Sequence, residues 1–273
     1  MIRKLLSKSS LFHCVYLWIV GKGVSPLKTL YFNLVAFRVG DALKFPVWIY
    51  QGVKIEEVGK IKISTSISSG IVRIGQPMFY RGTKTTFINR GTIVFDGNCK
   101  IMMGSTIHVL TPSATLILGR EVMISELVKI LCDTTINIGD FTRIAYGSTV
   151  IDSEFHYVLN IENGEVNAKR KPITIGKFNW IGNSSIIKKG VRTPDYCIVS
   201  NGSMLTKDYS ELPLYSLLMG APAKLRGSGF RRVYNDGNDH KLDEYFKENL
   251  NKYSIGDINH EQFCSGVIHV HDH

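Results

Sequence analysis

The feature that most constrains this chain is an aliphatic residue that returns at every sixth position. In the stretch ITIGKFNWIGNSSIIKKGVRTPDYCIVSNGSML, residues 173–205, only Thr193 departs from a register held by Ile175, Ile181, Ile187, Val199 and Leu205. A period of six matches neither the 3.6-residue helix nor the two-residue pleat, so it belongs to a larger repeated unit. We interpret this unit as one face of a coil.

The same period recurs earlier in the chain with slips of register. The inward positions are Phe95, Ile101 and Ile107, then Leu118, Ile124, Ile130 and Ile136, then Ile138, Ile144 and Val150. Three hexads would close one turn of a triangular coil, and stacked coils would pair their short strands in parallel at about 4.8 Å. About seven coils between Gly59 and Leu205 would give a prism about 33 Å tall. A sandwich of short strands is the alternative, but sandwiches do not hold a six-residue period.

Glycines mark the corners of this predicted solenoid. Each follows an inward aliphatic residue, where we expect a corner that needs a backbone without Cβ strain: Gly75, Gly119, Gly139, Gly176 and Gly182. The fold class predicted is an all-β solenoid, a parallel β-helix with an N-terminal segment and a C-terminal helix.

The period divides the chain into three parts. Residues 1–58 lack it and are expected to form a helix or two followed by an extended piece at 46–50. Residues 59–225 form the repeat domain. Residues 226–273 contain DHKLDEYFKENLNKY, a predicted helix that could cap the open end of the solenoid. The tail is expected to be a disordered end rather than a metal site, although it carries His260, His269, His271 and His273.

One interruption breaks the repeat domain. Between Val150 and Ile173 the period vanishes, and the sequence DSEFHYVLNIENGEVNAKRKP is polar and rich in turn residues. A solenoid tolerates an insertion as a loop thrown outward from a corner, and such loops usually line the binding face. We therefore predict an extruded loop over residues 152–172, with His156 near its start.

The composition indicates which partners to expect and in which compartment the protein is found. The formal net charge is +10, which favours an anionic partner such as a phosphate-bearing cofactor or an acidic membrane. The charge is spread without a basic run interleaved with aromatic residues, so nucleic-acid binding is disfavoured. The five cysteines show no metal-ligand spacing and indicate free thiols in a reducing compartment. We expect a cytoplasmic protein that needs no metal.

The N-terminus resembles the first parts of a signal peptide. Arg3, Lys4 and Lys8 precede the apolar run Leu11–Val20, but no small-x-small cleavage site follows. The run is far short of the roughly 20 apolar residues that a spanning helix needs. A packed or amphipathic segment is expected, with shallow contact to a membrane surface as the functional alternative.

Three segments resemble the signature of the hexapeptide-repeat acyltransferases, particularly their sugar O-acetyltransferase branch: PITIGKFNWIGNSSIIKKGV, IVSNGSMLTKD and GAPAK. The resemblance covers roughly residues 59–225. KTLYFN and FPVWI in the N-terminal segment are similar to acetyltransferases that decorate bacterial surface polysaccharides. The resemblance implies left-handed coils, a homotrimer with active sites between neighbouring prisms, and acetyl-CoA as donor. It also implies that a sugar hydroxyl in capsule, exopolysaccharide or O-antigen biosynthesis is acetylated. The acceptor would be a sugar or lipid-linked oligosaccharide met at the inner face of the cytoplasmic membrane.

The resemblance also suggests the catalytic residues. Removing the proton of a sugar hydroxyl requires a base near pH 7, and His156 matches the family's catalytic histidine by its place in the loop. A carboxylate could hold its imidazole in one tautomer, and Asp152 is preferred over Glu154 for that role.

A second group matches positions that line the coenzyme A cleft in the family. Trp180 precedes the inward Ile181, so it should point outward, either beside the pantetheine arm or into a trimer contact. The other matching residues are Gly182, Asn201, Ser203, Thr206, Lys207 and Lys224. Thr193-Pro194, Asn201 and Ala221 depart from the family's usual residues, which puts individual coenzyme contacts in doubt.

Other functions remain open at this point. An amino-sugar N-acetyltransferase is the nearest alternative, and a non-catalytic β-helix scaffold is another. A γ-class carbonic anhydrase needs three zinc-binding histidines, but the repeat region holds only His108 and His156.

Overall fold

The computed structural model describes residues 23–79 and 82–265, which form two compact units divided between Ser228 and Gly229. The apolar run Leu11–Val20 and the histidines at 269, 271 and 273 lie outside the described residues. Each unit is treated by itself below.

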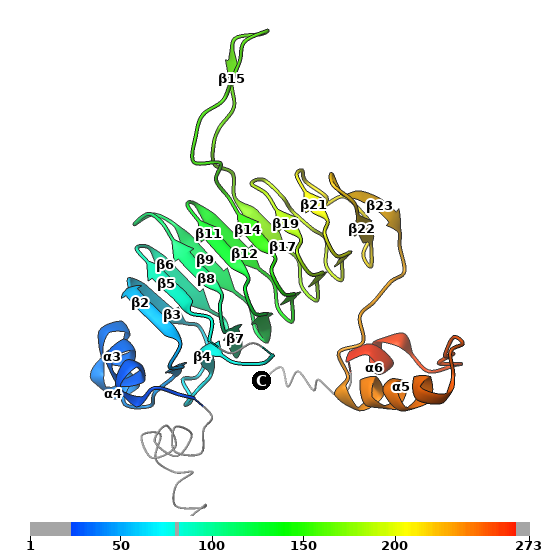
Figure 1. Cartoon of the computed structure of the whole chain (residues 1–273), viewed down its shortest axis with the longest axis horizontal. Coiled ribbons are helices and arrows are strands. Elements are labelled where there is room, and N and C mark those ends of the chain that lie inside the picture. Colours follow the sequence, from blue (N-terminus) through cyan, green and yellow to red (C-terminus); the bar gives the residue numbers. More distant parts are fainter. Residues whose placement is uncertain (1–22, 80–81, 266–273) are drawn as a thin grey trace, which may run out of the picture. The chain divides into compact units, whose positions relative to one another are not determined.

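The first unit is built from three parallel sheets whose strands alternate along the chain (Figure 1). The first sheet contains β1 (Val47–Ile49), β4 (Val72–Gln76), β7 (Cys99–Met102), β10 (Val122–Ile124), β13 (Arg143–Ile144), β18 (Trp180–Ile181), β20 (Ile198–Val199), β22 (Leu217–Met219) and the antiparallel β23 (Lys224–Gly227). The second sheet contains β2 (Val53–Glu57), β5 (Thr85–Asn89), β8 (Thr106–Val109), β11 (Lys129–Cys132), β14 (Thr149–Ile151), β19 (Ile186–Ile187) and β21 (Met204–Leu205). The third contains β3 (Lys60–Ile63), β6 (Thr92–Phe95), β9 (Thr115–Leu118), β12 (Thr135–Ile138) and β17 (Ile173–Ile175).

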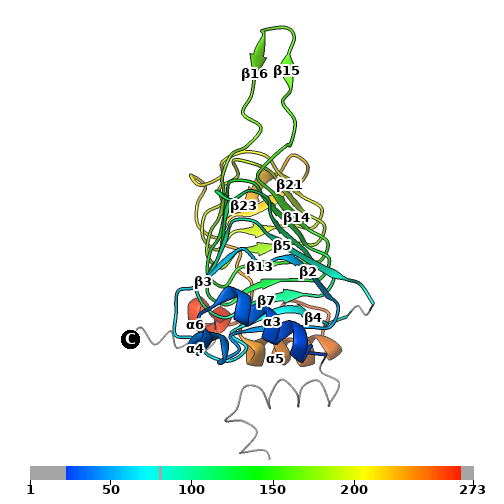
Figure 2. The same cartoon turned by 90° about the vertical axis from the view of Figure 1, so that its left-hand side faces the viewer.

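The hand of the coil can be followed in Figure 2, which looks from the N-terminal coil along the stack. The chain runs from β4 at the bottom to the second sheet on the right and then to the third sheet on the left, while successive coils recede. This path is counterclockwise as it moves away from the viewer. The fold is therefore a left-handed parallel β-helix, as predicted.

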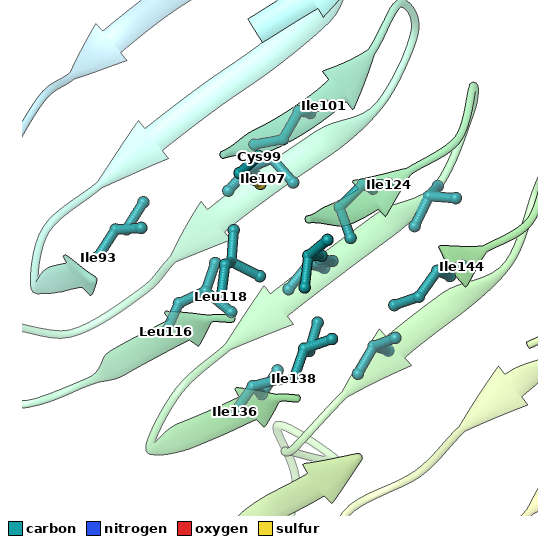
Figure 3. Packing of buried hydrophobic residues seen from close by; sticks show 14 of the residues in the cluster. Ile93, Cys99, Ile101, Ile107, Leu116, Leu118, Ile124, Ile136, Ile138 and Ile144 are labelled. Carbon is teal, nitrogen blue, oxygen red and sulfur yellow. The ribbon is translucent and has the colours of Figure 1, made fainter. Parts of the chain in front are cut away.

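The hexad residues form the core of the prism (Figure 3). Every aliphatic or aromatic residue predicted to point inward, from Phe95 to Leu205, is at most 1% exposed. Thr193, which breaks the pattern, is also buried, and its hydroxyl donates to the Asn179 side chain (2.8 Å) and accepts from the Gly176 N–H (3.1 Å). An internal hydrogen bond thus takes the place of an aliphatic contact in that coil.

The first coil begins earlier than the sequence suggested. β1 pairs with β4 and β2 pairs with β5, both in parallel, so the solenoid starts at Val47 rather than at Gly59. The hexad is present there as Ile49, Ile55 and Ile61, although bulky and charged neighbours obscure it in the sequence. The expected extended piece at 46–50 is the first strand of the prism.

Within the described residues, two helices precede the first coil, in agreement with the predicted helix or two. α3 (Pro26–Ala36) begins after the N-cap Ser25, whose hydroxyl accepts from the Lys28 N–H, and α4 (Val39–Ala42) follows. The buried Asn33 of α3 exchanges two hydrogen bonds with the backbone of Val47, 2.7 Å to its carbonyl and 3.1 Å from its N–H. This side chain satisfies the backbone at the start of the first strand of the prism.

The corners differ from the expectation in where the backbone strain lies. Gly176 does not have a positive φ; it is needed because an added Cβ would stand 2.5 Å from the Pro194 carbonyl of the next coil. Of the predicted corner glycines, Gly75 alone has a positive φ (84°), and the left-handed conformation also falls on aromatic residues at successive coils: Phe141, Phe178, Tyr196 and Tyr215 (φ 53–64°). Their rings stack along one corner with centroids 4.7, 4.9 and 4.8 Å apart.

The second unit, residues 229–273, contains α5 (Asp236–Glu248) and α6 (His260–Ser265). α5 confirms the helix predicted in this region, and the Asn235 side chain caps it by accepting from the Asn238 N–H (3.1 Å). Arg231 pairs with Glu261 and joins the start of the unit to α6. Capping of the solenoid by this unit stays a prediction.

Candidate active site

The extruded loop leaves the prism after β14 and returns at β17. Two backbone hydrogen bonds close its stem: the Lys171 N–H donates to the Asp152 carbonyl (3.1 Å), and the Glu154 N–H donates to the Lys169 carbonyl (2.8 Å). Together they form an antiparallel bridge between Ser153 and Arg170. Beyond the stem the loop forms a small hairpin of β15 (Leu159–Asn160) and β16 (Glu165–Val166) that projects away from the coils (Figure 1).

His156 lies between the stem and the hairpin, on an exposed stretch of backbone. The preceding Phe155 has a φ of 60°, and its N–H donates to the Ser153 hydroxyl (3.1 Å). The His156 N–H donates to the Glu154 carbonyl (2.7 Å). These local hydrogen bonds fix the backbone of His156. In the single chain its imidazole is exposed and accessible to a bound substrate.

Asp152 lies at the base of the loop and is completely buried. Its carboxylate accepts from the Asp133 N–H (2.7 Å), the Thr134 N–H (2.8 Å) and the Thr134 hydroxyl (2.9 Å) of the preceding coil. Within the described residues, no hydrogen bond joins this carboxylate to the His156 imidazole. The structure therefore does not bring the preferred orienting pair together, and Asp152 instead fixes the point at which the loop leaves the prism.

Glu154, the other candidate for orienting His156, is held by two lysines of a later coil. Its carboxylate lies 2.6 Å from the Lys189 ammonium and 3.3 Å from that of Lys188. The hydrogen bond from Lys189, followed by that from Lys188, lowers the pKa of this carboxyl below its ordinary value. Lys189 also donates to the Ala168 carbonyl (2.6 Å), so it links both sides of the stem.

These stem contacts were not predicted from the sequence. Arg170, within the loop, is another example, because its guanidinium Nε lies 2.5 Å from the carboxylate of the nearly buried Asp133. The partners are far apart in the chain, and no local pattern pairs them. The only signal was the hexad itself, which predicts that the corners of adjacent coils meet.

Trp180 points outward from the first sheet, as predicted, with 37% of its surface exposed. It lies opposite Arg143 of β13 and Ile198 of β20 on the outer face of the prism. Gly182 follows at the corner, where an added Cβ would stand 2.5 Å from the Asn201 side-chain oxygen. That oxygen accepts from the Asn183 N–H (2.8 Å), so Asn201 holds the corner of the neighbouring coil.

The remaining predicted residues lie toward the C-terminal end of the prism. Ser203 is buried, and its hydroxyl accepts from the Gly220 N–H (3.2 Å), which indicates a structural position. Thr206 is exposed and contributes hydrogen bonds at the Tyr209 phenol. The Tyr209 hydroxyl also donates to the Ala223 carbonyl (3.0 Å), while burial raises the pKa of this phenol.

The structure brings Lys207 and Lys224 together in one cleft. The cleft has a volume of about 190 Å³ and is lined by Lys207, Asp208, Tyr209, Glu211, Leu212, Lys224 and Leu225. The Lys207 ammonium lies 5.6 Å from the centroid of the Tyr209 ring. Hydrogen bonds from Ser210 keep the pKa of Asp208 low, so the cleft holds both signs of charge. A phosphate would be favoured at its lysine side.

Among residues 23–79 and 82–265, no group of His, Cys, Asp and Glu is arranged to hold a metal ion. No helix in the same part of the chain has the length and apolar character of a membrane span.

The chain is similar in sequence to a sugar acetyltransferase. Galactoside O-acetyltransferase of Escherichia coli (strain K12) is 33% identical over 147 residues, which are 53% of this chain and 61% of that protein. This match shows that the chain is similar in sequence to a sugar O-acetyltransferase, and the observed hexapeptide coils agree with the predicted resemblance to the hexapeptide-repeat acyltransferases. The match spans less than two thirds of the relative, and no family model matches the chain.

Solved structures of acetyltransferases resemble this one more loosely. The polysialic-acid-specific acetyltransferase NeuO is 20% identical, with a TM-score of 0.45 over 72% of this chain and 91% of that one. A hexapeptide-repeat acetyltransferase of Vibrio cholerae, complexed with acetyl coenzyme A, is 26% identical, with a TM-score of 0.36 over 41% and 60%.

Proposed function

We propose that the protein is an acetyl-CoA-dependent O-acetyltransferase that acts on a sugar hydroxyl. The observation that carries the proposal is the stem of the extruded loop, which is closed by backbone bonds and by the Glu154 contacts to Lys188 and Lys189. A loop fixed in this way holds the accessible His156 at a defined place beside the prism. Catalytic groups need such positioning more than they need exposure.

The proposed chemistry is a direct transfer. The His156 imidazole accepts the proton of the acceptor hydroxyl while the hydroxyl oxygen forms a bond to the carbonyl carbon of the thioester. The carbon–sulfur bond then breaks, and the proton passes from the imidazolium to the departing thiolate. A base of this kind contributes about 10²- to 10⁴-fold in rate.

The donor is proposed to lie along the C-terminal coils. Trp180 offers an exposed ring to the pantetheine arm, and the cleft that contains Lys207 and Lys224 supplies two cations for phosphate groups. Acetyl-CoA brings the activated acetyl group, and the chain's own residues orient it.

The acceptor is proposed to be a sugar hydroxyl of a surface polysaccharide or of its lipid-linked precursor. The name of the E. coli relative supports a hydroxyl rather than an amine. Amino-sugar N-acetylation is the outcome that the acceptor experiment must distinguish.

A homotrimer is also part of the proposal. The hairpin of the extruded loop exposes a set of apolar side chains that would be costly to leave in water: Tyr157 (66%), Val158 (68%), Leu159 (54%), Ile161 (88%) and Val166 (53%). A neighbouring prism could cover them and complete the site around His156.

Contact with a membrane surface is supported by α3. Thr29, Phe32 and Asn33 bury one face of this helix, while the opposite face exposes apolar side chains: Leu27 (80%), Tyr31 (55%), Leu34 (46%) and Val35 (54%). An exposed apolar helix face of this kind is expected to be covered by a partner or a membrane surface. The wild-type protein should sediment with anionic lipid vesicles, and Leu34→Asp should not; equal sedimentation of the two would contradict the contact.

The acceptor experiment tests the function directly. The protein is incubated with acetyl-CoA and with free sugars, amino sugars or extracted repeat-unit oligosaccharides, and released thiol is measured before the acetyl group is located by mass spectrometry. We expect acetyl esters on a sugar hydroxyl. Acetylation of an amine, or no thiol release with any acceptor, would contradict the proposal.

A further inference from the structure

The outer face of the first sheet carries a row of cations that the proposed chemistry does not use. Arg73, Lys100 and Arg143 occupy equivalent positions on β4, β7 and β13, in direct register through Met123 of β10, and Trp180 is the next residue of the row. Their neighbours in sequence point into the core, so all four side chains lie on the outside.

Two neighbouring cations of the row repel each other. Arg73 and Lys100 are Cα partners on adjacent strands, about 4.8 Å apart, where like charges repel. Within residues 23–79 and 82–265, neither of these two side chains forms an ion pair with a carboxylate. Arg73 instead packs its guanidinium 5.3 Å from the centroid of Trp48, and Arg143 donates to the Glu121 carbonyl. The Glu121 carboxylate accepts from Asn98 (2.8 Å). An anion along this face would relieve the repulsion.

The position of the row is suited to binding the acceptor rather than the donor. The donor, as proposed above, extends from Trp180 toward β23, which carries Lys224. The coils before Trp180 are therefore left for the acceptor, and four coil steps of about 4.8 Å separate Arg73 from Trp180, about 19 Å in all. This length exceeds a single sugar ring and suits an extended chain.

We propose that Arg73, Lys100 and Arg143 form a binding track for an anionic oligosaccharide, which delivers an acidic glycan rather than a neutral sugar to the site beside Trp180. This inference rests on the proposed function for the direction of the track. The binding of an acidic chain to the row does not itself depend on catalysis.

The first experiment measures binding without turnover. Full-length protein is titrated with an oligogalacturonate and with a neutral maltooligosaccharide in a calorimeter, for the wild type, Lys100→Glu and the control Lys62→Glu. Lys62 is an exposed lysine on β3 of the third sheet, so it matches the charge change on another face. We expect the wild type to bind only the acidic chain, a loss of roughly tenfold or more in Lys100→Glu, and little change in the control. The wild-type affinity should also fall as salt is added.

Several outcomes would overturn the track. Equal affinities of the two variants for oligogalacturonate would remove Lys100 from binding, as would equal binding of the neutral chain by the wild type. A change of assembly mass in Lys100→Glu by light scattering would show that the row is a subunit contact.

A transfer assay separates this proposal from the function itself. With acidic and neutral repeat-unit oligosaccharides, Lys100→Glu should lower kcat/KM only for the acidic acceptor and leave the KM for acetyl-CoA unchanged. Transfer that is equally efficient to both acceptors in both proteins would overturn the track while the O-acetyltransferase stands. Selective binding without any acetyl transfer would leave the track and overturn the function.

Discussion

His156 owes its proposed role to accessibility and to a fixed backbone. The His156→Ala variant should lower acetyl transfer about 100- to 10,000-fold, because the base is lost, while the fold is kept, since the residue packs against no core. Turnover is measured by thiol release, and folding by circular dichroism. Asn163→Ala, at the exposed hairpin tip, serves as a control in the same loop. Near-normal turnover of the His156 variant would remove this residue from the mechanism.

Asp152 was predicted to orient His156, but in the structure its carboxylate contacts the preceding coil. Its buried carboxylate satisfies the Asp133 and Thr134 N–H groups, so it acts on the backbone of the preceding coil. A charged residue next to a candidate base is ambiguous in sequence, because the same spacing fits a bond to the imidazole and a bond to the neighbouring coil. Only the stacking of coils decides between them.

The Asp152→Ala variant should therefore be destabilised, by about 2–6 kcal/mol, because the buried Asp133 N–H and the partly buried Thr134 N–H lose their acceptor at about 1–3 kcal/mol each. Denaturant unfolding measures the loss, and hydrogen exchange at residues 133 and 134 locates it. If Asp152 oriented His156 in the assembled protein instead, turnover would fall while the unfolding free energy and amide protection stayed close to those of the wild type.

At the scale of elements, the stacked corner explains how the prism tolerates strained residues. Left-handed backbone costs an ordinary residue roughly 1–2 kcal/mol, and four aromatic residues adopt it at successive coils. Each stacked pair returns about 0.5–1.5 kcal/mol. The corner thus selects aromatic side chains at positions where glycine or asparagine would be expected.

The central ring of this stack provides a test. Phe178→Ala loses two stacked contacts and keeps the left-handed strain, whereas Phe178→Gly loses the same contacts and releases the strain. We expect the glycine variant to be more stable than the alanine variant by about 1 kcal/mol, the reverse of the usual order. Denaturant midpoints of the two variants measure this difference. An alanine variant as stable as the glycine one would show that the corner relaxes.

The sequence predicted these elements as far as the hexad could be read. Inward residues, parallel pairing and the extruded loop all follow from the period of six. The first coil was missed because Trp48, Tyr50 and the Glu56-Glu57 pair obscure the spacing of Ile49, Ile55 and Ile61. The left-handed backbone of Phe178 could not be predicted from the sequence. The stacking that stabilises it involves residues of three different coils, and no local pattern reveals such contacts.

For the whole molecule, the exposed hairpin is the strongest reason to expect assembly. The protein should have a mass in light scattering of three times its chain mass of 30.6 kDa. The double variant Leu159→Glu, Ile161→Glu should dissociate at concentrations at which the wild type stays trimeric, because it places charges on the surface that a neighbour would cover. Asn163→Glu, at the hairpin tip, should not. An active wild-type monomer would contradict the shared site.

Because all coils have the same height, distances along the prism axis come in multiples of about 4.8 Å. The loop that carries His156 leaves the prism at β14, and β21 precedes Lys207; on the second sheet these strands are two steps apart, about 10 Å. Substitutions within a coil cannot tune this distance gradually, since every strand is fixed by the ones above and below it. Only the gain or loss of a whole coil would change it, in a jump of about 4.8 Å. The span between the proposed base and the coenzyme's anchor is thus expected to evolve stepwise.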